Sequence, residues 1–102
     1  MIDYTELLNS IRQFRDERDW LQYHTPPNLA QSISIEAAEL LELFQWGKVP
    51  STHDISEELA DVLIYCLNLA DILALDVTDI IQRKMAKNAI KYPAQHHEPA
   101  TE

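Results

Sequence analysis

Two pairs of acidic residues provide the clearest chemical signal in the sequence. The pairs are Glu36 with Glu39 and Glu58 with Asp61, and the members of each pair are three positions apart. Side chains at this spacing lie next to one another on an α-helix, so each pair directs its oxygens to one side. Two such pairs on neighbouring helices would gather four carboxylates where little water can reach them, and that arrangement requires cations. The pattern therefore predicts a divalent-metal site.

Acidic pairs at this spacing are common in the chain, because Asp and Glu account for 17 of its 102 residues. Most of them are expected to be solvated helix faces or partners of a helix dipole. The two central pairs differ because polar and aromatic residues share their faces, as in the wall of a ligand pocket. These neighbours are Asn28, Ser32 and Trp46 for the first pair, and Tyr65 and Asn68 for the second. Ligands that are all oxygen favour Mg²⁺ or Mn²⁺ over zinc or copper.

A basic segment near the C-terminus offers groups that can bind phosphate. It contains Lys84, Lys87, Asn88 and Lys91 on one predicted helix. Alone, the segment is better explained as a solvated helix end that complements the helix dipole. Beside a metal site its ammonium groups become candidates for contacts with phosphate oxygens. The residues that can provide stacking surfaces for a base are Trp20, His24, Trp46 and Tyr65, although each alone is more often a core residue.

Composition excludes several classes of function. The formal net charge of −9 argues against a nucleic-acid polymer or a membrane surface as partner. A single glycine rules out the glycine-rich loops that cradle phosphates, so metal ions or side chains must hold any phosphate. The lone Cys66 is expected to be a small buried apolar residue. No signal peptide is recognisable and charges interrupt every long apolar run, which predicts a cytoplasmic protein.

Four helices are expected to position these residues, with no strand. Apolar periodicity and cap residues predict helices over 3–23, 28–46, 51–75 and 76–92. Thr25-Pro26-Pro27 is expected to end the first helix and Gly47 the second. The predicted architecture is an all-α, four-helix bundle-like domain over residues 1–93, followed by a disordered tail over 94–102.

The third helix predicts self-association. It is apolar on nearly all sides from Val62 to Leu75, which is typical of a central, buried helix. One copy of so short a chain has only a thin core to cover it. The sequence therefore predicts a dimer or a dimer of dimers.

The motif Glu36-Ala-Ala-Glu39, followed after eighteen residues by Glu58-Leu-Ala-Asp61, resembles that of the MazG-like all-α nucleoside triphosphate pyrophosphohydrolases. The resemblance runs from Phe14 to Pro93. It is closest to the dCTP pyrophosphatase branch in the flanking stretches Arg18-Asp19-Trp20, His24, Asn28-Leu29, Glu42 to Trp46, Asp61 to Tyr65, Lys84 to Asn88, and Lys91-Tyr92-Pro93.

The resemblance implies that the four acids bind Mg²⁺ and that the α–β phosphoanhydride of a nucleoside triphosphate is hydrolysed. Assembly as a dimer or tetramer, with the site at a subunit boundary, is also implied. The metal count stays open, because Ile35 stands where many members carry another acid. Glu39, then Glu36, is the candidate general base. The expected substrate-binding set is Trp20, His24, Asn28, Trp46, Tyr65, Lys84, Lys87, Asn88, Lys91 and Tyr92.

Two other functions compete with this one. A ferritin-like dimetal oxidase needs a Glu-x-x-His pair, and none of the four histidines has a glutamate three residues before it. A non-enzymatic helical adaptor or oligomerisation module would use the apolar third helix to dock a partner. It would leave the four acids without a role.

Overall fold

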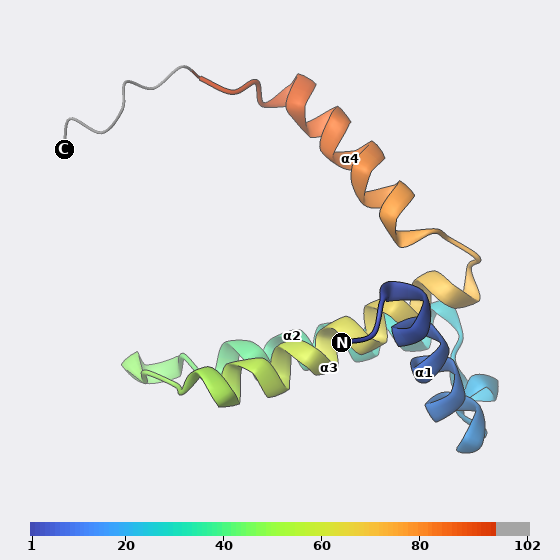
Figure 1. Cartoon of the computed structure of the whole chain (residues 1–102). Coiled ribbons are helices and arrows are strands. Elements are labelled where there is room, and N and C mark those ends of the chain that lie inside the picture. Colours follow the sequence, from blue (N-terminus) through green and yellow to red (C-terminus); the bar gives the residue numbers. More distant parts are fainter. Residues whose placement is uncertain (96–102) are drawn as a thin grey trace.

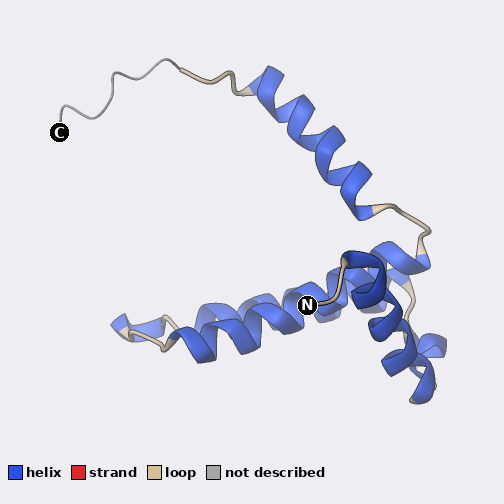
Figure 2. Ribbon diagram, viewed as in Figure 1, coloured by secondary structure: helices blue, strands red, loops and turns tan. Residues whose placement is uncertain are grey.

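The computed structural model describes residues 1–95, and their regular structure is entirely helical (Figure 2). The elements are α1 (Tyr4–Glu17), η1 (Trp20–Tyr23), α2 (Pro26–Glu42), η2 (Gln45–Gly47), α3 (Thr52–Ile72) and α4 (Val77–Lys91). The predicted all-α class with four helices is therefore confirmed for this part of the chain. No helix within it is long and apolar enough to span a bilayer. The predicted tail lies outside the described residues from position 96 onward.

Side-chain oxygens start each α-helix. Asp3, Thr25, Ser51 and Asp76 each accept a hydrogen bond from the backbone N–H three residues later, at 2.8–3.3 Å. These bonds satisfy backbone donors that have no partner within the helix.

Several predicted helix boundaries were wrong: the second helix was predicted to reach residue 46 and the third residue 75, whereas α2 ends at Glu42 and α3 at Ile72. The first helix stops at Glu17 because Asp19 adopts a left-handed backbone, with φ of 57°, before the short η1 turn. Pro26 and Pro27 open α2 instead of ending the preceding helix. Proline fits the first helical turn because its φ is already helical and its missing N–H would have had no partner there.

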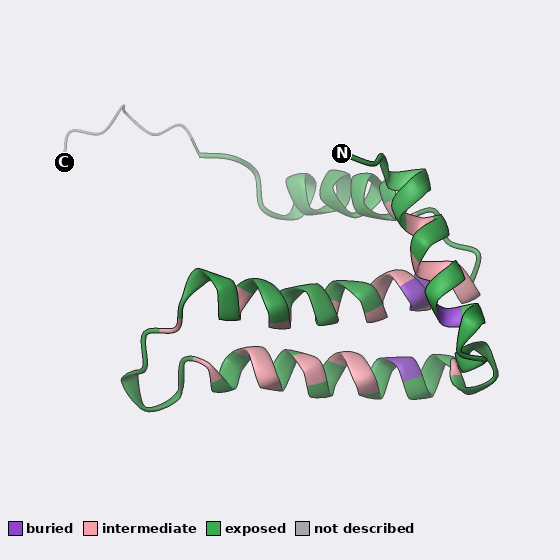
Figure 3. Ribbon diagram, turned by 60° about the horizontal axis from the view of Figure 1, so that its bottom comes forward, coloured by how far each residue is buried: buried purple, intermediate pink, exposed green. Residues whose placement is uncertain are grey.

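The central unit is an antiparallel hairpin of α2 and α3, whose helices lie side by side and are joined through η2 (Figure 3). α1 packs across the C-terminal part of α3 (Figure 1). Hydrogen-bonded ion pairs join these two helices. Asp71 accepts hydrogen bonds from Arg12 Nε and from Arg15 Nη1, both at 2.8 Å.

The Arg12–Asp71–Arg15 triad is well shielded at its centre, because the side chains of Arg15 and Asp71 are only 7% and 13% exposed. Hydrogen bonds from Arg12 hold the pKa of the Asp71 carboxyl below its usual value, with those from Arg15 adding to the effect against opposing burial. The triad therefore stabilises the α1–α3 junction only while Asp71 is ionised.

Very little of one chain is buried. Leu29 and Ala70 are the only buried apolar residues in the described part, and Arg15 and Asn68 the only buried polar ones. The third helix, predicted to be central, is not buried within one chain: Leu59, Leu63 and Ile64 are 43%, 52% and 42% exposed. A hairpin covered on one side by a short crossing helix leaves the other faces of α3 open.

α4 does not close a bundle within one chain. It extends away from the hairpin (Figure 1), and every residue from Thr78 to Lys91 is exposed. The predicted bundle-like arrangement is thus only partly present in a single copy. Helices with an apolar stripe that remain this exposed need a further surface to pack against.

Candidate metal centre

The predicted acidic pairs come together on the seam between α2 and α3. One carboxylate oxygen from each of Glu36, Glu58 and Asp61 lies within 4.8 Å of the others. Glu39 lies next to this group, because its carboxyl is close enough to raise the pKa of both Glu36 and Glu58. The antiparallel hairpin causes this convergence: the last turns of α2 face the first half of α3, so one pair from each helix meets the other.

The carboxyl groups of the acidic cluster (Glu36, Glu39, Glu58 and Asp61) repel one another when ionised. Burial raises the pKa of the Glu36 carboxyl, and the neighbouring carboxyls of Glu39, Asp61 and Glu58 raise it further, to about 7. The pKa of Glu58 is raised in the same way, by burial first and then by Glu39 and Asp61. Glu36 Oε2 and Glu58 Oε2 are buried and have no hydrogen-bond partner among residues 1–95. Negative charge is therefore held where neither water nor protein donors offset it.

A hard divalent cation fits this donor set. The buried, unpartnered oxygens of Glu36 and Glu58 require a positive partner, and carboxylate oxygens are the ligands that Mg²⁺ and Mn²⁺ prefer. Within the described residues no histidine or cysteine joins the cluster, so it lacks the mixed ligands of a typical zinc or di-iron site.

The raised pKa of Glu36 predicts how pH and metal act on stability. The ordinary pKa of a glutamate carboxyl is 4.5, and in the folded protein that of Glu36 is about 7. Between these two pH values the folded state binds more protons than the unfolded state, so the metal-free protein loses stability as pH rises. In EDTA the melting temperature should therefore fall between about pH 5 and pH 8. Mg²⁺ should raise it at the higher pH and have little effect at the lower, because protons then compete for the ligands.

Thermal melts at both pH values, with EDTA or Mg²⁺, measure this effect. The control is Glu36→Gln, which should melt at a temperature less dependent on pH in EDTA. An equal Mg²⁺ effect at both pH values would contradict the assignment of the cluster as a metal site.

A cavity of about 300 Å³ lies one helical turn from the acidic cluster, toward the start of α2. Ser32 is four residues before Glu36, and Tyr65 is four residues after Asp61, so both helices carry the cluster's face into this cavity. The residues that line the aromatic cavity are Trp20, Tyr23, His24, Asn28, Leu29, Ser32 and Tyr65.

Two polar residues of the aromatic cavity, His24 and Asn28, can form hydrogen bonds with a ligand. Burial, aided by the positive charge of Arg15, lowers the pKa of His24, so its imidazole is neutral at physiological pH. Its Nδ1 atom is buried and has no hydrogen-bond partner in the described part of the chain. Asn28 Nδ2 donates to the Tyr23 carbonyl at 3.0 Å, which fixes the orientation of the amide. A flat aromatic wall with fixed polar groups suits a nucleobase.

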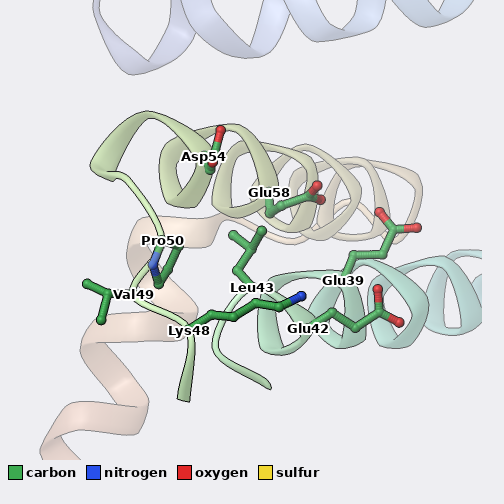
Figure 4. A pocket seen from close by; sticks show the side chains of 8 residues that line it. All are labelled: Glu39, Glu42, Leu43, Lys48, Val49, Pro50, Asp54 and Glu58. Carbon is green, nitrogen blue, oxygen red and sulfur yellow. The ribbon is translucent and has the colours of Figure 1, made fainter. Parts of the chain in front are cut away.

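A larger cavity of about 700 Å³ lies on the opposite side of the acidic cluster (Figure 4). It is lined by Glu39, Glu42, Leu43, Lys48, Val49, Pro50, Asp54 and Glu58. Lys48 is the only cationic side chain among them, so we call this space the Lys48 cavity. Glu39 and Glu58 belong both to the acidic cluster and to the wall of this cavity, so the cluster and the cavity are adjacent.

The other predicted substrate-binding residues lie elsewhere in a single chain. Trp46 is 90% exposed in η2, with a left-handed backbone at φ of 62°. Lys84, Lys87, Asn88 and Lys91 lie along exposed α4, and Tyr92 directly follows it. None of these residues lines the aromatic cavity or the Lys48 cavity.

Several residues that line the two cavities were not predicted from the sequence, above all Lys48 and Tyr23. Lys48 lies in a short loop, where helical periodicity gives no information about direction. A usable signal was present nonetheless: it is the only lysine between the two acidic pairs. Tyr23 was assigned to the first helix, whereas the η1 turn directs it into the aromatic cavity.

Comparisons with known proteins identify relatives of this chain. Residues 31–102 match the model of the MazG-like family. dCTP pyrophosphatase 1 of Homo sapiens is 40% identical over 92 residues, which cover 80% of this chain and 54% of the relative. The Mus musculus protein of the same name is 37% identical over 91 residues, covering 79% and 54%. The chain thus spans about half the length of these curated relatives.

The fold is also found in a solved structure, that of a pyrophosphatase from Archaeoglobus fulgidus DSM 4304. It is 46% identical, superposes with a TM-score of 0.80, and the match covers 92% of this chain and all of the other. Since the family match alone includes more than two thirds of the sequence, together with both acidic pairs, the chain belongs to the MazG-like family.

Proposed function

We propose that this protein is a Mg²⁺-dependent nucleoside triphosphate pyrophosphohydrolase that cleaves the α–β phosphoanhydride and releases a nucleoside monophosphate and pyrophosphate. The observation that carries the proposal is the acidic cluster, with two buried carboxylate oxygens that lack partners, beside an aromatic cavity. Membership of the MazG-like family and the similarity to proteins named dCTP pyrophosphatase 1 support dCTP as the preferred substrate.

In this mechanism Glu36, Glu39, Glu58 and Asp61 would hold Mg²⁺, which supplies charge neutralisation at the phosphates and an acidified water. Glu39 is the first candidate for the general base, because it lines the open Lys48 cavity where a water can reach it. Glu36 is the second candidate, since its raised pKa suits proton transfer near neutral pH but one of its oxygens is buried. Trp20 and Tyr65 would stack on the base, which neutral His24 and Asn28 would orient by hydrogen bonds.

A panel of the dNTPs and NTPs with Mg²⁺, followed by ³¹P NMR of the products, tests this proposal. The expected products are a monophosphate and pyrophosphate, with dCTP the fastest substrate. Release of orthophosphate and a diphosphate would place cleavage at the β–γ bond and refute the mechanism. Inertness toward every nucleotide would favour the adaptor alternative, and iron-dependent oxygen uptake would favour an oxidase.

Self-association forms part of the proposal. An apolar groove of about 540 Å³ separates α1, α3 and the start of α4, and its walls include Leu7, Leu63, Ile64, Val77, Ile80 and Ile81. A second copy is the simplest partner to cover this groove, because the exposed apolar residues of α3 and α4 are numerous and the chain has almost no core of its own. Such an assembly would also give the α4 lysines a route to a neighbouring acidic cluster.

Replacing Leu63 by glutamate should disrupt a homodimer or homotetramer, because the substitution buries a charge at the covered face. Sedimentation equilibrium of the parent should give two or four chains, and Leu63→Glu should shift the mass toward one chain with loss of helix content. Ile2→Glu, at an exposed residue before α1, is the matched control and should leave the assembly intact. A monomeric, fully helical parent would contradict the proposed assembly.

A further inference from the structure

The Lys48 cavity contains an ammonium group that forms no direct ion pair with any described residue. Lys48 forms no ion pair within residues 1–95, although Glu39, Glu42, Asp54 and Glu58 line the same cavity. Figure 4 shows its side chain extended along the cavity toward Glu39 and Glu42. The ammonium group is therefore available to an anion that enters the cavity together with a divalent cation.

The backbone at Lys48 is held in place. Its N–H donates to the Gln45 carbonyl at 3.2 Å, closing the η2 turn. Gly47 precedes it in a left-handed conformation, with φ of 73°, and Pro50 follows two residues later. A fixed backbone lowers the conformational entropy lost when the side chain binds a ligand. The η2 turn thus presents Lys48 at a defined place on the cavity wall.

The order of features along the α2–α3 seam gives a direction to the substrate. Ser32 and Tyr65 mark the aromatic cavity, and Glu39 and Glu58 mark the Lys48 cavity, seven residues away on each helix. Seven helical residues span about 10 Å. A nucleotide with its base in the aromatic cavity and its α-phosphate at the acidic cluster would therefore extend its remaining phosphates toward Lys48.

We infer that Lys48 binds the β- and γ-phosphates of the substrate, which become the pyrophosphate product. This inference rests on the proposed function and adds a residue to it. Four carboxylates line the cavity against one ammonium group, so pyrophosphate enters only as its magnesium complex. A lysine suits this role because it acts as a point charge toward phosphate without needing a fixed geometry.

Calorimetric titration of the full-length protein with inorganic pyrophosphate and Mg²⁺ tests the inference. Lys48→Met should weaken this binding about tenfold, the usual loss for one hydrogen bond to a charged group. Binding of dCMP should stay unchanged, because the monophosphate does not reach the Lys48 cavity. Lys48→Arg keeps the charge and should bind pyrophosphate nearly as the parent does. Arg83→Met, at an exposed α4 residue whose ion pair in the described part of the chain is with Asp79, is the matched control.

Circular dichroism should show equal helix content in all variants. Unchanged pyrophosphate affinity in Lys48→Met would overturn the inference, as would an equal loss for pyrophosphate and dCMP. The proposed function fails separately: a parent that binds magnesium pyrophosphate through Lys48 but hydrolyses no nucleotide would refute the function and retain the binding site. If the parent hydrolyses dCTP and Lys48→Met is equally active, the proposed function stands and the role of Lys48 is refuted.

Discussion

Glu58→Gln is expected to reduce turnover of dCTP by about a hundredfold or more, because even outer-shell partners of a metal commonly contribute 10–100-fold to affinity or activity. The substitution preserves shape and removes one negative charge from the acidic cluster. Mg²⁺ affinity should fall together with turnover. The variant without metal should, in contrast, melt at a higher temperature than the parent, because burial and Glu39 raise the pKa of Glu58 and make its ionised form unfavourable.

Glu57→Gln is the matched control for this experiment. It removes the same charge from the adjacent residue, whose side chain is 67% exposed and faces His53 at 3.5 Å, outside the cluster. Kinetics over a Mg²⁺ titration and melts in EDTA provide both readouts. If Glu58→Gln hydrolyses dCTP as the parent does, Glu58 is not a metal ligand. If it loses activity and melts earlier in EDTA, the loss reflects damage to the fold.

Asp71→Ala is expected to cost about 3 kcal/mol of folding stability, near the lower end for breaking one side of a buried ion pair. The substitution leaves the 7%-exposed Arg15 side chain without its shielded partner. In the parent the hydrogen bonds from Arg12 and Arg15 lower the pKa of Asp71. Its contribution is therefore present above the ordinary carboxyl pKa and is lost as pH falls through the lowered value.

Urea unfolding at equal protein concentration measures this loss, since any self-association makes stability depend on concentration. Asp16 is the other ion-pair partner of Arg15, and its side chain is 55% exposed. Asp16→Ala should therefore cost far less folding stability than Asp71→Ala. The double variant Arg15→Met, Asp71→Leu should recover much of the stability, because apolar residues of similar size can replace a buried pair. If Asp71→Ala is as stable as the parent, the triad contributes nothing to stability at the α1–α3 junction.

The convergence of Glu36 with Glu58 and Asp61 could be predicted from the sequence because it depends on local rules. Each pair has helical spacing, and a short loop between two helices makes them antiparallel neighbours. The Arg12–Asp71–Arg15 triad could not be predicted, since its partners lie 56 and 59 positions apart.

Two other features depended on information that periodicity does not contain. The left-handed residue Asp19 ends a helix that the apolar pattern would have continued, and left-handed Trp46 lies in the η2 turn after α2; Tyr23 and Lys48 follow these turns and line the cavities. α4 has almost no packing within one chain, so its apolar pattern alone does not determine where it lies. Its lysines therefore remain a proposal for the assembled protein.

The most direct test of the metal site is anomalous diffraction from crystals grown with Mn²⁺ in place of Mg²⁺. The acidic cluster predicts a strong anomalous peak between α2 and α3, within coordination distance of Glu36, Glu39, Glu58 and Asp61. Well-ordered crystals of active protein that show no peak there, or a peak bound by other residues, would contradict the account.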